Sequence, residues 1–181
     1  LDGKPLTVAN VLIEMLRLHQ ITCGHFKSDD GEITHLNNNR LNELLNVLNE
    51  APNKVIIWAS YLNDIHSIIN KLKHCYGEDS YVQYHGAVTP DERQDGIHRF
   101  QEDPKCRFFV GNPQTGGFGI TLTAANTVVY YSNSYNLEHR IQSEDRAHRI
   151  GQKNTVTYVD IICNGTAVSY THLTLPTNRE V

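Results

Sequence analysis

Hydrophobic residues recur along this chain with two different periods, and the change of period marks its organisation. In the first fifty residues they lie three or four positions apart, which predicts two amphipathic helices, carried by Val8, Val11, Leu12, Met15, Leu16 and His19 and then by Leu41, Leu44, Leu45 and Leu48. The polar stretch between them, KSDDGEITHLNNN, predicts an exposed connection or a small hairpin. We therefore expect residues 1–52 to form a helical lead-in segment that flanks the main fold, with Pro52 ending the second helix.

From Lys54 onward, short apolar runs alternate with amphipathic segments, which is typical of βαβ units around a parallel sheet. The predicted strands are Val55–Ala59, Tyr81–Tyr84, Phe108–Gly111, Thr127–Tyr131 and Thr155–Ile162. The predicted helices are Asn63–Cys75, Pro90–Gln101 and Leu137–Ile150, and the second begins at a capping box formed by Thr89 and Glu92. We expect an α/β lobe over residues 53–167, with its ligand-binding loops after the carboxyl ends of the strands.

Composition excludes several classes of protein. No apolar run in the 181 residues approaches the roughly 18 that a membrane helix needs. The formal charge of −4 argues against a polybasic binder, although it does not exclude contact with phosphates. The four cysteines and ten histidines form no CxxC, HExxH or HxH motif, so we expect reduced, buried thiols and no metal site. The chain begins with neither Met nor a signal peptide, and we expect it to be an internal fragment.

Two stretches carry candidate chemistry. The glycine-rich run GNPQTGGFGITLT, residues 111–123, follows a predicted strand and could bring backbone N–H groups close to phosphate oxygens, or it could be a turn that needs positive φ. It is neither a P-loop nor a GxGxxG fingerprint. The run QSEDRAHRIGQ, residues 142–152, places Gln142, Arg146 and Arg149 on one stripe of a helix, where two guanidiniums could hold a phosphoryl group. The alternative is a solvated face on which Glu144 and Asp145 pair with the arginines.

Four runs together resemble a known family: KVIIWASYLNDI, YHGAVTPDERQDGIHRF, QTGGFGITLTAANTVVYY and QSEDRAHRIGQ. From about Val55 to Cys163 the chain is similar to the second, C-terminal RecA-like lobe of Swi/Snf-type DNA translocases in helicase superfamily two. The last run is the most specific, and the Asn-Ser-Tyr-Asn that precedes it is closer to phage-type members. The resemblance implies a RecA-like parallel sheet flanked by helices, a P-loop NTPase-type second helicase lobe, after a helical N-terminal extension.

The resemblance also implies residue roles at a nucleotide site. Arg146 and Arg149 would be arginine fingers that reach the γ-phosphate of ATP, with Arg149 the more important and Gln142 beside them. Gly117 and Gly119 would line the nucleotide cleft. The cofactor would be ATP with Mg²⁺, and the Mg²⁺ would be held by the N-terminal RecA-like lobe of the same protein.

The second implied site is a nucleic-acid contact surface. Ser60, Tyr61, His85 and Gly86 would lie on loops that follow the phosphate backbone of double-stranded DNA without reading bases. Asn112 and Thr115 join this set, although the family commonly has Ser-Thr-Arg-Ala where this chain has Asn-Pro-Gln-Thr. Pro113 offers neither a hydroxyl nor an N–H, so Thr115 would have to replace that contact.

The implied function is the C-terminal motor lobe of an ATP-dependent double-stranded DNA translocase or helicase, in the cytoplasm of a bacterial or phage-infected cell or in a eukaryotic nucleus. The chain has no GxxxxGK[ST], and its Asp-Glu-x-x run, DERQ, belongs to the predicted capping box rather than to a magnesium-binding DExx motif, so we expect it to hydrolyse no ATP alone. Two alternatives remain open: a non-catalytic nucleic-acid-binding or scaffold module derived from such a lobe, and, more remotely, a nucleotide-sugar-binding enzyme. The run VSYTHLTLPTNREV at residues 168–181 resembles translated adapter sequence, and we expect it to be a non-native tail.

Overall fold

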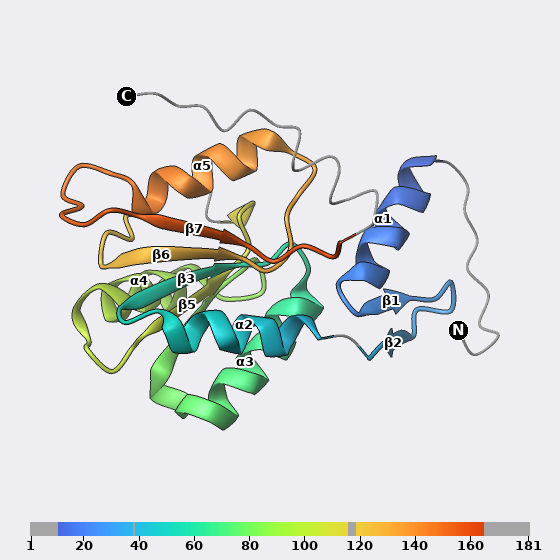
Figure 1. The fold of residues 1–181 in the computed structure, drawn as a ribbon, viewed down its shortest axis with the longest axis horizontal. Coiled ribbons are helices and arrows are strands. Elements are labelled where there is room, and N and C mark those ends of the chain that lie inside the picture. The colour runs from blue at the N-terminus through green and yellow to red at the C-terminus, as the bar shows by residue number, and fades with distance from the viewer. Residues whose placement is uncertain (1–10, 38, 116–118, 165–181) are drawn as a thin grey trace. The chain divides into compact units, whose positions relative to one another are not determined.

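The computed structural model describes residues 11–37, 39–115 and 119–164, and its centre is a five-stranded parallel sheet (Figure 1). The strand order is β4-β5-β3-β6-β7. The strands are β3 (Lys54–Trp58), β4 (Tyr81–Tyr84), β5 (Phe108–Gly111), β6 (Ala125–Tyr130) and β7 (Thr157–Asp160). All four neighbouring pairs are parallel. The RecA-like α/β architecture predicted from the sequence is confirmed, and each predicted strand is present, with ends that differ by no more than two residues.

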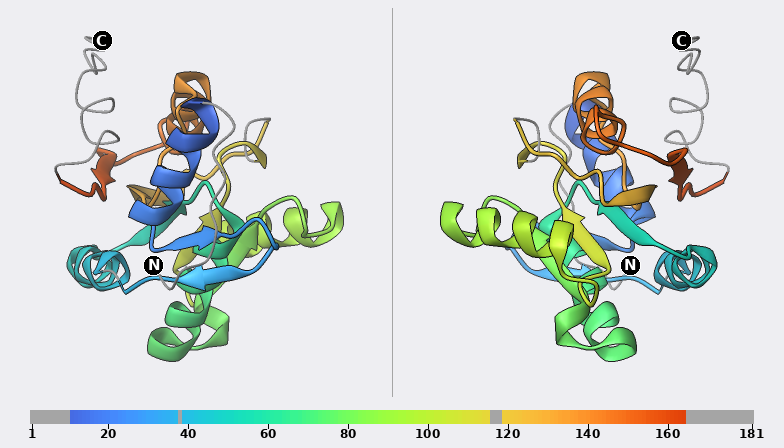
Figure 2. Two further views of the ribbon diagram at one scale, coloured as in Figure 1. Left: turned by 90° about the vertical axis from the view of Figure 1, so that its right-hand side faces the viewer. Right: turned by 90° about the vertical axis from the view of Figure 1, so that its left-hand side faces the viewer.

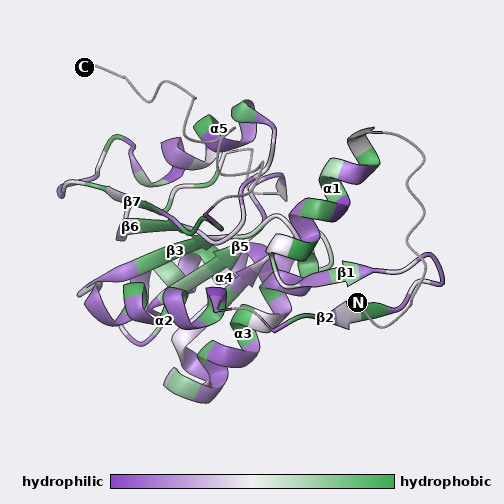
Figure 3. Cartoon of the chain, turned by 45° about the vertical axis from the view of Figure 1, so that its right-hand side comes forward, coloured by the Kyte–Doolittle hydropathy of each residue, from purple (hydrophilic) through white to green (hydrophobic). Residues whose placement is uncertain are grey.

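Strand β3 is at the centre of the sheet because its sequence has no polar side. Val55, Ile56, Ile57 and Trp58 are all fully buried, so both faces of this strand are covered. A strand that packs against helices on both faces needs a continuous apolar run rather than an alternating one. Figure 3 shows the same property as green ribbon along β3 and β6, whereas the helices alternate between green and purple.

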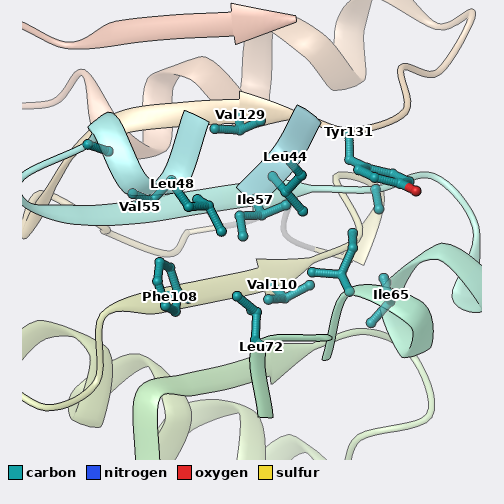
Figure 4. Packing of buried hydrophobic residues seen from close by; sticks show 13 residues of the cluster. Leu44, Leu48, Val55, Ile57, Ile65, Leu72, Phe108, Val110, Val129 and Tyr131 are labelled. Atoms are coloured by element: carbon teal, nitrogen blue, oxygen red, sulfur yellow. The ribbon is translucent and has the colours of Figure 1, made fainter. Parts of the chain in front are cut away.

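Four helices cover the two faces of the sheet (Figure 2). Helices α2 (Arg40–Glu50) and α3 (Leu62–Tyr76) lie on one face, and α4 (Pro90–Glu102) and α5 (Leu137–Ala147) lie on the other. The first face is packed by Leu44 and Leu48 of α2 and Ile65 and Leu72 of α3 against the sheet residues that Figure 4 labels, Val55, Ile57, Phe108, Val110, Val129 and Tyr131. On the second face Phe100 of α4 packs against Phe109 with ring centroids 5.4 Å apart.

Helix α4 starts at the signal that the sequence provides. Helix α4 begins with the predicted capping box: the Glu92 N–H donates to Thr89 Oγ1 at 3.3 Å, and the Thr89 N–H donates to Glu92 Oε2 at 3.1 Å. Helix α2 lies before the predicted lobe boundary at residue 53, but its leucines pack in the same core as the lobe. Residues Leu41–Ile161 accordingly form one compact unit.

The described residues before Leu41 belong to a second compact unit. Helix α1 (Val11–Thr22) is followed by a hairpin of β1 (His25–Lys27) and β2 (Ile33–His35), which pair antiparallel. The hairpin alternative for the polar connection is therefore confirmed. Its turn contains Gly31 at φ +84°, a left-handed conformation that favours glycine.

Three other predictions concern small features. All four cysteines are free, but only Cys23 and Cys106 are buried, so the expectation of buried thiols was wrong for the exposed Cys75 and Cys163. Within the described ranges no cluster of His, Cys, Asp or Glu could hold a metal, and no helix is long and apolar enough to cross a membrane. The predicted non-native tail, residues 168–181, lies outside the described residues.

Gly111 allows a test of the core. It is the last residue of β5, paired with Trp58 on one side and Tyr84 on the other. A Cβ at this position would lie 2.9 Å from Trp58 Cζ3 and 3.0 Å from the Tyr84 carbonyl oxygen. We expect Gly111→Ala to lower the free energy of unfolding by about 1–3 kcal/mol, because the sheet must open to accept the methyl group. Denaturant unfolding measures the change.

The matched control is Gly86→Ala. A Cβ at Gly86 would meet no atom within 4 Å, so we expect a change in the free energy of unfolding of less than about 0.5 kcal/mol. Equal stability of the two variants would contradict the packing described for the carboxyl end of β5.

Candidate nucleotide and nucleic-acid sites

The loops at the carboxyl ends of three neighbouring strands are joined by hydrogen bonds. Ser60 follows β3, Asn112 follows β5, and Ser132 follows β6. The Ser60 hydroxyl donates to the Ser132 carbonyl at 3.0 Å, and Asn112 Nδ2 donates to the Ser60 carbonyl at 3.0 Å. Ser132 Oγ accepts from the Ser60 N–H at 2.9 Å and donates to the buried Asp64 carboxylate at 2.8 Å. This network holds the three loops in one arrangement.

The predicted DNA-contacting residues on these loops therefore also have internal roles. Asn112 Oδ1 accepts from the Gln114 N–H at 2.8 Å, and the Asn112 carbonyl accepts from the Thr115 N–H at 3.1 Å. Pro113, where the family commonly has a hydroxyl, is buried. Tyr61 is partly buried just before α3. Contact of Ser60, Tyr61, Asn112 and Thr115 with a phosphate backbone stays a prediction.

His85 and Gly86 directly follow strand β4, the neighbour of β5 in the sheet. The His85 ring is buried, lies 6.0 Å from the His66 ring in a T-shaped arrangement, and has Nε2 3.3 Å from Gln83 Oε1. Burial lowers the pKa of His85, and the nearby His66 and Arg93 lower it further. These effects favour the neutral imidazole and so reduce the charge that His85 could bring to a phosphate. Gly86 is exposed beside it.

The glycine-rich stretch is described only in part. Gly117 lies outside the described residues, so its predicted place in a nucleotide cleft has no structural account. Gly119 is exposed and has φ +76°, which agrees with the alternative of a turn that needs positive φ. The next residue, Ile120, is buried, so the chain turns inward after Gly119. A contact between Gly119 and nucleotide stays a prediction.

Helix α5 ends at Ala147, three residues earlier than predicted. His148 leaves the helical conformation with ψ +82°, so Arg149 does not continue the stripe of Arg146. Gly151, at φ +105°, belongs to the turn that follows. The two guanidiniums still meet. Arg146 Nη1 lies 3.5 Å and Arg149 Nη1 3.2 Å from the same carbonyl oxygen, that of Ile120.

Arg149 and Glu144 have partners other than those that the solvated-face alternative gives them. Arg149 Nη1 also donates to Thr121 Oγ1 at 3.0 Å, so the contacts of Arg149 in the described part of the chain are uncharged. Glu144 is bonded instead to Arg140, whose Nε lies 2.6 Å from Glu144 Oε1. Gln142 donates to Glu138 Oε1 at 2.8 Å, one turn away from Arg146, and its predicted place beside the arginines stays a prediction.

Gln152 is a structural residue of this region that sequence reasoning missed. Its Nε2 lies within hydrogen-bond distance of three carbonyl oxygens, those of Ala125 (2.7 Å), Thr123 (3.2 Å) and Ala147 (3.3 Å). These contacts attach the turn after α5 to the beginning of β6. The signal in the sequence is that this glutamine ends the family-specific run QSEDRAHRIGQ, which does not reveal its partners.

An open groove of about 700 Å³ lies in front of the arginine pair. Its lining residues are Asp145, Arg146, His148, Arg149, Ile150, Gln152 and Asn154. Ile150, between the second arginine and the turn glycine, is completely exposed. Two guanidiniums against one carboxylate fit an anionic phosphoryl group, to which arginine can donate two parallel hydrogen bonds.

The two candidate sites lie at opposite edges of the sheet. Helix α5 begins after the carboxyl end of β6 and ends before β7, so it runs back across the sheet (Figure 1). Arg140, near its start, bonds Asp160 at the end of β7, whereas Gln152, after its end, bonds Ala125 at the start of β6. The arginine groove is therefore at the amino edge, and the loops after β3–β6 form the carboxyl edge.

Comparison with known proteins gives the same assignment as the fold. The family model "Helicase conserved C-terminal domain" matches residues 37–151. The ATP-dependent helicase fft2 of Schizosaccharomyces pombe is 34% identical over 133 residues, which are 72% of this chain and 10% of that protein. The chromatin-remodeling ATPase INO80 of Debaryomyces hansenii is 29% identical over 157 residues, 87% of this chain and 11% of that protein. The chain thus spans about a tenth of the length of these curated relatives.

Two solved structures share the fold. The C-terminal part of the Fun30 ATPase domain superposes with a TM-score of 0.67 at 26% identity, over 74% of this chain and 44% of that one. The Sulfolobus solfataricus SWI2/SNF2 ATPase core, solved with double-stranded DNA, has a TM-score of 0.67 at 26% identity, over 86% of this chain and 34% of that one. With the matched helicase domain, these likenesses show that the chain belongs to the helicase C-terminal domain family and is the C-terminal RecA-like lobe of a Swi/Snf-type helicase of superfamily two.

Proposed function

We propose that this lobe works in an ATP-dependent double-stranded DNA translocase, where it supplies Arg146 and Arg149 to the γ-phosphate of ATP. The observation that supports this role best is the convergence of both guanidiniums on one carbonyl oxygen beside an open groove. The relatives named above are an ATP-dependent helicase and a remodeling ATPase, which supports the use of ATP. The phosphate-binding lysine and the acidic Mg²⁺ ligand are absent from this sequence, so both would come from the N-terminal RecA-like lobe.

The arginines would act mainly through charge and position. Bound ATP with Mg²⁺ would supply the phosphoryl group and part of the neutralisation of its oxygens. Arg149 would donate N–H groups to the oxygens on which negative charge grows in the transition state, and Arg146 would hold the same group from the end of α5. Gln152 would keep the turn that carries Arg149 in place, because its amide bonds the start of β6.

The carboxyl edge is the proposed DNA side. The exposed Gly86 and the partly buried Tyr61 and Thr115 lie on its loops, where they could contact phosphates without reading bases. The neighbouring Sulfolobus structure was solved with double-stranded DNA, which supports this choice of partner. Because one relative is named a chromatin-remodeling ATPase, and chromatin is nuclear, the nuclear location has more support than the cytoplasmic one.

Arg149→Ala in the full-length protein tests the arginine role. We expect DNA-stimulated hydrolysis to fall by about 10³-fold or more, since an arginine finger contributes about 10³–10⁵ to kcat, while the Kd for ATP changes little. Steady-state hydrolysis with saturating duplex and nucleotide binding by fluorescence give the two values. The control is Arg99→Ala on α4, an arginine 38% exposed that pairs with Asp79 and Asp103 away from the groove. Turnover equal to that of the control would remove the proposed role.

Hydrolysis by the 181-residue chain alone is a second test. We expect none above the buffer rate, with or without duplex DNA, because the chain lacks the lysine and the acidic motif that bind and activate the reacting groups. Robust turnover by the purified chain would show that these groups come from within it and would contradict the division of labour proposed above.

Gly86→Asp tests the DNA side. We expect it to weaken duplex binding by the full-length protein several-fold, about equally for unrelated sequences, because one negative charge is added to an exposed loop beside the phosphates. The control is Asn70→Asp, which adds the same charge at an exposed position in the middle of α3. Fluorescence anisotropy at several salt concentrations measures the affinity. Equal affinity of the two variants would place the DNA elsewhere.

A further inference from the structure

Arg140, in the first turn of α5, bonds side chains from three parts of the lobe. Its guanidinium forms a two-point bond with Asp160 at the end of β7, Nη1 to Oδ1 at 2.5 Å and Nη2 to Oδ2 at 3.0 Å. Nε donates to Glu144 Oε1 at 2.6 Å, and Nη1 donates to Asn133 Oδ1 at 3.0 Å. Asn133 Nδ2 in turn donates to Asp160 Oδ1 at 2.7 Å. The side chain, only 20% exposed, is thus bonded to α5, β7 and the loop after β6.

A tyrosine ring completes this cluster. The guanidinium lies over the ring of Tyr130, the last residue of β6, 3.5 Å from its centroid. Ser143 Oγ donates to the Arg140 carbonyl at 2.8 Å and so accepts from the Tyr130 hydroxyl, 2.7 Å away. Tyr130 therefore holds Arg140 at two points. Its ring contacts the guanidinium directly, and its hydroxyl is linked to the Arg140 carbonyl through Ser143. We call Arg140, Asn133, Asp160, Tyr130 and Glu144 the α5 clamp.

The clamp fixes the direction of a short, lightly packed helix. In α5 only Ser143 and Ala147 are buried, so few apolar side chains oppose a rotation of the helix on the sheet. Arg146 lies six residues beyond Arg140, which is about 9 Å along a helix, so a tilt of about 10° at the clamp would move it by about 1.5 Å. A group that holds a transferring phosphoryl must be positioned within a fraction of that distance, since a 1 Å error costs about 100-fold in rate.

The chemistry of the clamp requires arginine. The planar guanidinium stacks on Tyr130 while it donates in two directions, to Asp160 and to Glu144. A lysine ammonium keeps the charge but has neither the plane for stacking nor the fork for a two-point bond. Lysine at residue 140 would therefore keep an ion pair but lose the fixed angle between α5 and β7.

We propose that Arg140 is a positioning residue for hydrolysis, which acts by holding α5 at the angle that brings Arg146 and Arg149 together at the phosphoryl group. This role rests on the proposed function of the two arginines. Through α5, a cluster at the carboxyl edge of the sheet would thus influence the reaction at the amino edge.

Arg140→Lys in the full-length protein is the test. We expect DNA-stimulated kcat to fall by about ten- to hundred-fold, with the KM for ATP and the affinity for duplex DNA changed by less than about twofold, because the groove keeps both arginines but not their alignment. Arg99→Lys on α4 is the matched control, since it also converts a paired arginine to lysine. A kcat equal to that of the control would overturn the proposal.

A combined variant separates positioning from loss of structure. In a background that carries both Arg146→Ala and Arg149→Ala, we expect Arg140→Lys to cause no further fall in single-turnover rate, because both groups that it positions are gone. A further fall as large as in the wild-type background would show a merely structural role and overturn the proposal. If Arg140→Lys lowers the yield of folded protein, Asp160→Asn replaces it, because this change weakens the same clamp and leaves Arg140 in place. The same fall in kcat is expected. If Arg149→Ala alone leaves kcat unchanged, the proposed function fails first, and that result is distinct from both others.

Discussion

The lobe depends on the burial of one strand, β3, on both faces and both edges. Val55 to Trp58 carry no exposed surface, so their apolar area is removed from water by helices above and below and by β5 and β6 on either side. Their backbone hydrogen bonds must be made entirely within the sheet, because water cannot reach them. The loops of the carboxyl edge are attached to this strand or to its neighbours: Ser60 lies two residues after its end, and Trp58 limits how closely Gly111 can approach.

The sequence carries strong information on the fold because two periods of hydrophobicity differ so clearly. The VIIW and FFV runs are short and rich in β-branched and aromatic residues, which favours buried strands, and Thr89, Pro90 and Glu92 mark a helix start by local chemistry. All of these elements appear in the structure as predicted. The end of α5 was predicted wrongly because nothing local marks it. Ala147 and His148 are tolerated in helices, and the visible stop signal, Gly151, belongs to the next turn.

The contacts within the candidate sites could not be predicted, because they join residues that are far apart in the sequence. The arginines were assigned from the resemblance of their run to the family, but their meeting point, the Ile120 carbonyl, is 26 and 29 residues away in sequence. Gln152 and Arg140 could not have been assigned from the sequence, because their roles consist of bonds to Ala125, Asp160 and Asn133, which only the folded sheet brings near. A composition near neutrality in residues 136–155, with four basic and three acidic side chains, gave no hint that one arginine was bound internally while the other two face a groove.

The position of β3 in the sheet has a consequence for synthesis of the chain. Its two partners are β5, about fifty residues later, and β6, about seventy residues later, so the most apolar segment emerges long before either strand that covers its edges. Pairing at such sequence separation carries a large loop-closure cost and makes folding slow. Until Tyr130 has been added, one edge of β3 has no native partner, and the nascent lobe exposes a strand that other chains can pair with. The order that places β6 and the arginines late in the lobe therefore also leaves β3 exposed to aggregation while the chain is being made.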